Sequence, residues 1–218
     1  ITYSAGDYVA SLSRTTERVA HGANAAGSTM TVNGTTAQYS YGVDGWYSGS
    51  TRVASSATYA PTGVTANATY TAKGTRSLRS YTVTYNKGSY ISSVSRASES
   101  VSYGSNAAGS TATVATGYNF DGWYNGGTRV STSLTYAPTN VKSNLTLTAK
   151  ATINKYTVTA SPYFRNTDGT GNYTSGTTGG TVSGGGSVNY GGSTTVTATP
   201  AAGYKFDGWY SDGATGGS

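Results

Sequence analysis

The sequence contains no cysteine, a single histidine, few large apolar residues apart from tyrosine, and few charges. Charged residues make up 10% of the 218 positions, with only 3 Phe, 3 Trp and 1 Met. The lack of cysteine excludes disulfide bonds and zinc–thiolate sites. One histidine, His21, gives little support for a catalytic triad or a histidine metal site, and it reads as a surface residue. We therefore predict a chain that is not an enzyme and that has no catalytic residue, cofactor or metal ion.

Residues that favour helices are also scarce, and no window shows an apolar stripe at helical spacing. Gly occurs 31 times and Tyr 20 times, and Ser and Thr are abundant. This composition favours short strands joined by tight turns. Because the hydrophobic fraction is only 35%, tyrosine must fill much of the core. The sequence predicts a mainly β fold, and it contains no apolar run that would insert into a membrane.

The charges have no pattern that points to a nucleic acid. Fourteen Lys and Arg residues against eight Asp and Glu residues give a net charge of +6. These residues are spread along the chain, whereas a nucleic-acid-binding protein gathers them on one face or stripe. We therefore expect no nucleic-acid partner.

Two long segments of the chain are copies of each other. Residues 2–29 align without a gap with residues 84–111. The first copy then has an insertion of five residues near 33–41, and the match resumes between 44–73 and 121–150. Internal repetition of this kind is typical of arrays of small modules.

A third, more divergent copy begins with YTVT at 156–159, which echoes YTVT at 81–84. By alignment it lacks the last two strands of the other copies, and the first copy begins partway into its opening strand. The predicted units are a first repeat at 1–78, a second and complete repeat at 79–152, and a third at 153–218. The stretches 74–80 and 151–155 are predicted to be short linkers.

The motif GYNFDGWY at 117–124, followed by a glycine turn and by LTLTAK at 145–150, resembles a known family. It is similar to the Listeria–Bacteroides repeat, the B-repeat of internalin-type surface proteins. GYKFDGWY at 203–210 resembles the divergent branch of that family. The chain departs from the family pattern at Val43, where Phe is usual, and at Gly74 and Ala151, which replace the closing aromatic residue.

The resemblance implies tandem β-grasp (ubiquitin-like) modules in an elongated array, located outside the cell or on the surface of a bacterium. It implies a stalk or fibre segment, or an interaction module, with no catalysis. The short helix of a β-grasp fold has one candidate position, 105–109. Because that stretch is flanked by Gly and Ala, a β-sandwich-like module stays open as the alternative.

The aromatic residues of the shared motif are predicted to form the core. Phe120 and Trp123 have opposite parity in their strand, and a bulge at Gly122 would turn both rings inward. The tryptophans occupy one repeat position, which favours packing over sugar binding. The predicted core residues are Trp46, Trp123, Trp209, Phe120 and Phe206.

Tyrosines that recur in the repeats are the candidates for exposed contacts. Surfaces rich in Tyr, Ser, Thr and Asn favour glycan or protein contacts. The alternative function is therefore an adhesin module that binds a glycan or a host glycoprotein. Open strands at the chain ends would instead favour self-association into fibres. The candidate contact residues are Tyr8, Tyr90, Tyr47, Tyr124, Tyr210, Tyr59 and Tyr136.

Two further chemistries compete with plainer interpretations. Asn166, Asp168 and Asn172 are spaced loosely like a calcium loop, and an Asx-rich turn is the alternative. A lysine, a glutamate and an aspartate also recur, which would suit an isopeptide crosslink, and ordinary surface charges are the alternative. The recurring pairs are Lys73 and Lys150, Glu17 and Glu99, and Asp44 and Asp121.

Overall fold

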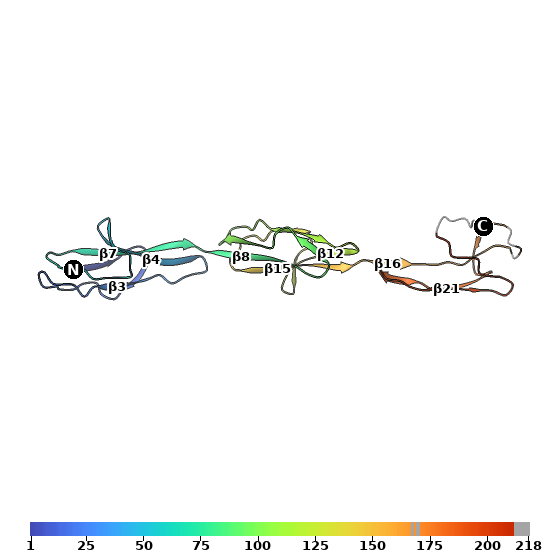
Figure 1. The fold of residues 1–218 in the computed structure, drawn as a ribbon, viewed down its shortest axis with the longest axis horizontal. Coiled ribbons are helices and arrows are strands. Elements are labelled where there is room, and N and C mark those ends of the chain that lie inside the picture. The colour runs from blue at the N-terminus through green and yellow to red at the C-terminus, as the bar shows by residue number, and fades with distance from the viewer. Residues whose placement is uncertain (167, 169–170, 212–218) are drawn as a thin grey trace.

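The computed structural model describes residues 1–166, 168 and 171–211. The molecule is a long, narrow rod in which most strands run along the long axis and the repeats follow one another (Figure 1). The described residues form strands and turns and contain no helix, so the predicted mainly β fold is confirmed. Consequently, no helix in the described residues could cross a membrane.

The first repeat is built from two sheets. One sheet has the order β1-β7-β4-β5, with β1 and β7 parallel, and the other has the order β2-β3-β6. The strands are β1 (Thr2–Ala5), β2 (Val9–Leu12), β3 (Ser28–Val32), β4 (Tyr39–Ser48), β5 (Thr51–Ala54), β6 (Thr58–Tyr59) and β7 (Thr69–Leu78).

The second repeat has the same design with one more strand in its larger sheet. The orders are β10-β8-β15-β12-β13 and β14-β11-β9, and β8 and β15 form the central parallel pair. The strands are β8 (Ser80–Lys87), β9 (Ile91–Val94), β10 (Ser98–Ser102), β11 (Ser110–Val114), β12 (Tyr118–Asn125), β13 (Thr128–Ser131), β14 (Thr135–Tyr136) and β15 (Leu145–Ile153).

The third repeat is organised differently. Its described strands pair two by two, as β16 with β20, β17 with β18 and β19 with β21. The strands are β16 (Lys155–Val158), β17 (Tyr163–Phe164), β18 (Thr174–Ser175), β19 (Gly180–Gly184), β20 (Gly186–Asn189) and β21 (Val196–Pro200).

The strands follow the period-two pattern of the sequence. In β8, Val83 and Tyr85 are buried, Thr84 between them is partly buried, and Thr82 before them is exposed. In β15, Leu147 and Ala149 are buried on one face. Successive side chains of a strand point to opposite faces, so this alternation gives each strand one apolar face for the core.

The bulge predicted at Gly122 is present. The pairing of β12 with β15 shifts register between Phe120 and Gly122. Gly122 has φ 151°, and a Cβ there would lie 2.5 Å from the Ser131 carbonyl oxygen. A side chain at this position therefore has no room, which explains why the motif carries glycine. Gly45 occupies the same position in β4, where the register also shifts.

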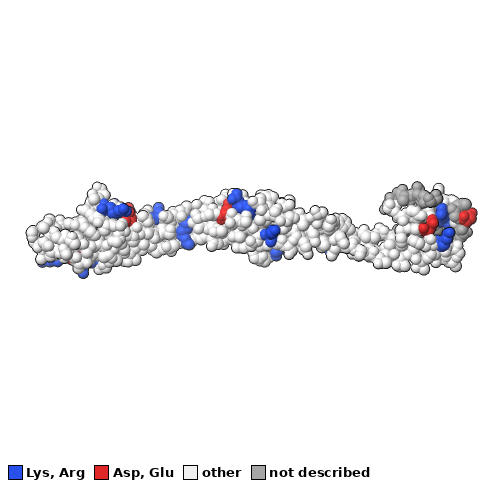
Figure 2. Space-filling model, viewed as in Figure 1, with Lys and Arg blue, Asp and Glu red and all other residues white. Residues whose placement is uncertain are grey.

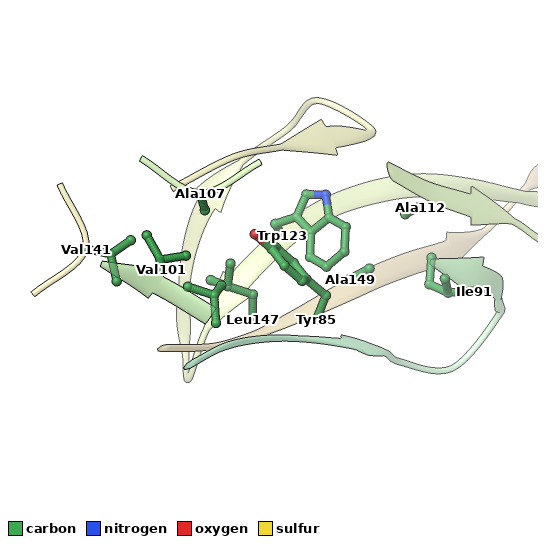
Figure 3. Packing of buried hydrophobic residues seen from close by; sticks show 10 residues of the cluster. Tyr85, Ile91, Val101, Ala107, Ala112, Trp123, Val141, Leu147 and Ala149 are labelled. Atoms are coloured by element: carbon green, nitrogen blue, oxygen red, sulfur yellow. The ribbon is translucent and has the colours of Figure 1, made fainter. Parts of the chain in front are cut away.

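The core of the second repeat lies between its two sheets (Figure 3). Trp123 has no exposed surface, and its indole N–H donates to the Leu134 carbonyl at 3.1 Å. The Tyr85 ring meets it edge to face, with centroids 5.7 Å apart. The first repeat repeats this packing with Trp46 and Tyr3, at 5.6 Å. Tyrosine therefore fills the core beside tryptophan, as the composition requires.

Two expectations differ from the structure. Residues 105–109 form an irregular segment in place of the helix that a β-grasp module would have, because Gly104 and Gly109 break the backbone with φ of 79° and 86°. The stretches predicted as linkers are largely strand, since β7 continues to Leu78 and β15 continues to Ile153. One residue separates each of these strands from the strand that opens the next repeat.

Candidate functional site: inter-repeat joints and recurring clusters

Consecutive repeats are connected through a single residue that is bonded on both sides. At the first joint, the Arg79 N–H donates to the Gln38 carbonyl of the first repeat at 2.9 Å. The Arg79 carbonyl accepts from the Tyr103 N–H of the second repeat at 2.8 Å. Both peptide groups of the connecting residue are thus used to link the two modules.

The second joint has the same bonding. The Asn154 N–H donates to the Gly117 carbonyl at 2.9 Å, and the Asn154 carbonyl accepts from the Tyr190 N–H at 2.8 Å. The Tyr190 ring lies directly against Gly117, where an added Cβ would be 2.0 Å from a ring carbon. A recurring backbone arrangement therefore fixes both joints.

Side chains reinforce the first joint through the loop inserted in the first repeat. The Arg79 guanidinium donates to the Thr36 carbonyl at 2.8 Å, and the Tyr81 hydroxyl donates to the Ala37 carbonyl at 2.6 Å. The Arg79 guanidinium also lies 5.1 Å from the Tyr81 ring centroid. The five-residue insertion thus supplies acceptors that hold the start of the second repeat.

A carboxylate ties each of the first two repeats together internally. Glu99 accepts from the Tyr85 hydroxyl at 2.8 Å and from the backbone N–H groups of Ala108 and Gly109, each at 2.9 Å. Burial alone would raise the pKa of Glu99, but these donors and the Arg96 charge outweigh it and hold that pKa below its ordinary value. Glu99 therefore connects β8 to the irregular segment before β11.

Glu17 has the same role in the first repeat. It accepts from the Tyr3 hydroxyl, from the N–H groups of Ala26 and Gly27 at 3.0 Å, and from the Arg14 guanidinium at 2.9 Å. Burial opposes a charged carboxylate here as well, yet these donors lower the pKa of Glu17. The network is therefore a shared structural element.

A second recurring cluster lies on the surface of the D-G-W-Y strand. Tyr124 donates to Asp121 at 2.7 Å, Arg129 pairs with Asp121 at 3.2 Å, and the Lys150 ammonium lies 4.1 Å from the Tyr124 ring centroid. The hydrogen bond to Asp121 raises the pKa of Tyr124. The equivalent residues of the first repeat have the same contacts. These are Asp44, Tyr47, Arg52 and Lys73.

These contacts give the residues proposed for an isopeptide crosslink separate partners. Glu17 and Glu99 bind backbone N–H groups, whereas Lys73 and Lys150 pack on tyrosine rings. The geometry therefore favours the plainer interpretation, in which the recurring charges stabilise strand ends and turns.

The other candidate contact tyrosines fall into two groups. Tyr59 and Tyr136 pack against the cores of their repeats, and the Tyr59 ring lies 6.4 Å from Trp46. Tyr8 and Tyr90 sit in equivalent turns with φ of 60° and 65°, which is unusual for a residue with a side chain. Tyr90 is 54% exposed and stacks on Tyr118 with centroids 4.0 Å apart.

The aromatic residues of the third repeat lie in a different environment. Trp209 is 48% exposed and Phe206 is 50% exposed, although both were expected in the core. Residues 202–211 form no strand, and none of the described strands pairs with them as β15 pairs with β12 at Trp123. Tyr210 lies 5.8 Å from Tyr173, whose hydroxyl donates to Asp207.

The described residues contain no group of three His, Cys, Asp or Glu side chains that could hold a metal ion. The loop considered for calcium falls partly outside the described residues, at 167, 169 and 170, so that idea stays a prediction. His21 is exposed and lines a surface hollow with Glu17 and Arg18. The segment before His21, residues 16–20, corresponds to β10 of the second repeat, which pairs with β8.

Sequence reasoning missed the joints and one further group of residues. It assigned Arg79 and Asn154 to linkers or their edges and gave no role to Tyr39, Tyr41 or Arg76. The available signal was the insertion at 33–41, which adds residues where the second repeat needs none. The register of β4 against β7 shows what the insertion contacts, and a register is not visible in a single sequence.

The fold and the recurring clusters define a tandem array of small β modules joined end to end. The Listeria-Bacteroides repeat domain matches residues 81–150, and the Divergent InlB B-repeat domain matches residues 171–216. These two segments therefore belong to this repeat family. Such repeats are typical of bacterial surface or secreted proteins and are generally non-enzymatic. No curated protein and no solved structure matched the chain.

Proposed function

We propose that this segment is a stiff, non-catalytic spacer in a bacterial protein displayed on the cell surface or secreted. The observation that supports this function best is the bonding of Arg79 and Asn154 on both sides. A flexible linker would leave the peptide groups of such residues in water. Here they continue the hydrogen bonding of the modules across each joint, so bending a joint requires breaking these bonds.

The close succession of β7 and β8 along the chain supports the same function. The stretch from Thr69 to Lys87 is extended apart from Arg79, so one continuous line of backbone runs through two modules. Extended backbone also gives the most length per residue, about 3.3 Å. Charged side chains are sparse on the face shown in Figure 2, and this low charge suits an exposed rod whose sequence is rich in Ser, Thr and Tyr.

Distance measurements between spin labels test the stiffness of the first joint. Because the chain has no cysteine, labels can be attached at introduced cysteines alone, for instance in Ser55→Cys with Thr132→Cys, two exposed positions in equivalent turns. We expect a narrow distance distribution. Arg79→Pro removes the N–H donor, and a Gly-Gly-Ser insertion after Arg79 separates the modules, so both should broaden it.

The matched control is the same Gly-Gly-Ser insertion between Gly126 and Gly127, in the turn between β12 and β13. It lengthens the chain equally but leaves the joint intact, so the distribution should stay narrow. If the unaltered chain already gave a distribution as broad as that of the insertion after Arg79, the spacer function would be abandoned.

A further inference from the structure

Four side chains of the first repeat form a cluster of three tyrosines around one arginine. The Arg76 guanidinium carbon lies 4.4 Å from the Tyr39 ring centroid and 5.0 Å from the Tyr8 ring centroid. Tyr41, which pairs with Arg76 across β4 and β7, lies 5.8 Å from Tyr8 and 6.5 Å from Tyr39. We call Tyr8, Tyr39, Tyr41 and Arg76 the Tyr–Arg cluster.

Special features of the backbone bring this cluster together. Tyr8 has φ 60°, a left-handed conformation that is unusual for a residue with a side chain and that Tyr90 shares in the second repeat. The insertion at 33–41 supplies Tyr39 and lengthens β4. Gly74 donates its N–H to the Asp7 carbonyl at 2.8 Å, and a Cβ on Gly74 would lie 3.2 Å from the Cβ of Tyr8. The small residue therefore lets the turn approach β7.

The second repeat shows that the fold does not need this cluster. Its Tyr118 pairs with Ile153 at the position where Tyr41 pairs with Arg76. Without an arginine, Tyr90 stacks flat on Tyr118, with an angle of 11° between the ring planes. The same module thus exists with and without the arginine, so its folding does not depend on the cluster.

Arg76 has donors to spare. The residue is exposed, and in the part of the chain that the structure describes its guanidinium forms no ion pair and no hydrogen bond. Asp7, the acidic residue of the adjacent turn, does not pair with it either. A guanidinium has five N–H donors in one plane. Two rings hold that group here, so the N–H groups at its edge are available to a carboxylate or sulfate, which arginine binds through two parallel hydrogen bonds.

We propose that the Tyr–Arg cluster binds an acidic sugar unit of a polysaccharide. The carboxylate or sulfate of the sugar accepts hydrogen bonds from Arg76, and the sugar ring packs on the neighbouring tyrosine rings, which offer rigid apolar faces with polar edges. The net charge of +6 draws such a polyanion to the chain. This inference goes beyond the spacer function and stands or falls independently of joint stiffness.

Calorimetric titration of the full chain with an oligogalacturonate hexamer tests the proposal. The fully methyl-esterified hexamer is the control for the ligand, since it keeps the sugar rings and loses the charges. We expect saturable binding of the acidic hexamer and at least tenfold weaker binding of the ester. Arg76→Ile, which copies the second repeat, should weaken binding at least tenfold while the thermal unfolding temperature stays close to that of the unaltered chain.

Arg18→Ile is the matched control for the protein, because Arg18 is an exposed arginine that contacts no aromatic ring in the described residues. It removes the same charge and should change affinity less than twofold. Arg76→Lys keeps the charge but not the planar group, so it should lose part of the affinity. Equal effects of Arg18→Ile and Arg76→Ile, equal binding of the ester, or no binding of the acidic hexamer would each overturn the proposal.

Discussion

At the scale of single residues, one carboxylate organises each of the first two repeats. Glu99 accepts from a buried tyrosine hydroxyl and from two backbone N–H groups, and Glu17 does the same. Gly109, with φ 86°, directs its N–H at Glu99, and a Cβ there would lie 2.6 Å from the Tyr136 carbonyl oxygen. The conformation of the irregular segment before β11 thus depends on a glycine and an acid together.

This network predicts how stability depends on pH. A carboxyl whose pKa is lower in the folded state contributes stability that is complete above its ordinary pKa of about 4.3 and is lost as the pH falls through the lowered value. Since the pKa values of Glu17 and Glu99 are both lowered, the unfolding free energy should decrease below about pH 4. Glu99→Gln should reduce this dependence and cost about 1–3 kcal/mol at pH 7.

Denaturant unfolding of the full chain, followed at several pH values, measures this effect. Asp7→Asn is the control, because Asp7 is exposed and outside the network. An acid dependence that is unchanged in the Glu99→Gln variant would show that other groups cause it.

At the scale of secondary-structure elements, a bulged strand decides which aromatic residue is buried. The bulges at Gly45 and Gly122 add a residue to β4 and β12, so that the indole points into the core. The strand that pairs with the motif comes from a distant part of the chain, since β15 lies next to β12 in the sheet. The motif therefore buries its tryptophan only where such a strand is present, and Trp209 remains 48% exposed.

The same substitution at two tryptophans should therefore have different effects. Trp123→Ala removes a fully buried ring and should destabilise the second repeat by about 3–5 kcal/mol. Trp209→Ala should cost less than about 1 kcal/mol, as expected for a partly exposed side chain. Hydrogen exchange of backbone amides in the full chain measures each repeat separately. Similar losses of protection in the second and third repeats would contradict this difference.

At the scale of the whole molecule, the joints make an extended rod from modules that could otherwise move independently. Each joint has the same two backbone hydrogen bonds, but they differ in their side chains. The first uses the inserted loop, and the second packs Tyr190 on Gly117. Beside the second joint, the side-chain carbonyl of Asn154 is buried and finds no donor among the described residues, which makes this joint the less completely bonded of the two.

Gly117→Ala should therefore loosen the second joint and leave the first unchanged. The new methyl group would overlap the Tyr190 ring, and φ 85° at Gly117 disfavours any side chain. Spin labels at Thr132→Cys and Ser193→Cys should report a broader distance distribution in this variant, while the pair at 55 and 132 should not change. Gly127→Ala, which has open space around it, is the control. An unchanged distribution between 132 and 193 would mean that the ring contact does not hold this joint.

The strands, the repeats and the family could all be predicted from the order of the amino acids. Period-two alternation marked 81–85 and 145–149 as strands, and the opposite parity of Phe120 and Trp123 indicated Gly122 as the place for a bulge. Matched Glu17 and Glu99 indicated a shared role without showing their partners. These features could be predicted because they depend on neighbours in the chain and on recurrence.

Which residues meet across the modules became visible only in the folded molecule. The joints at Arg79 and Asn154, the pairing of Tyr41 with Arg76, and the partial exposure of Trp209 all depend on contacts between segments far apart in the sequence. The sequence predicted short linkers at 74–80 and 151–155, yet pairing with β4 and β12 made most of these residues strand. Local preference is weak compared with the hydrogen bonds and burial that a neighbouring strand provides, so the connections could be read only from the folded molecule.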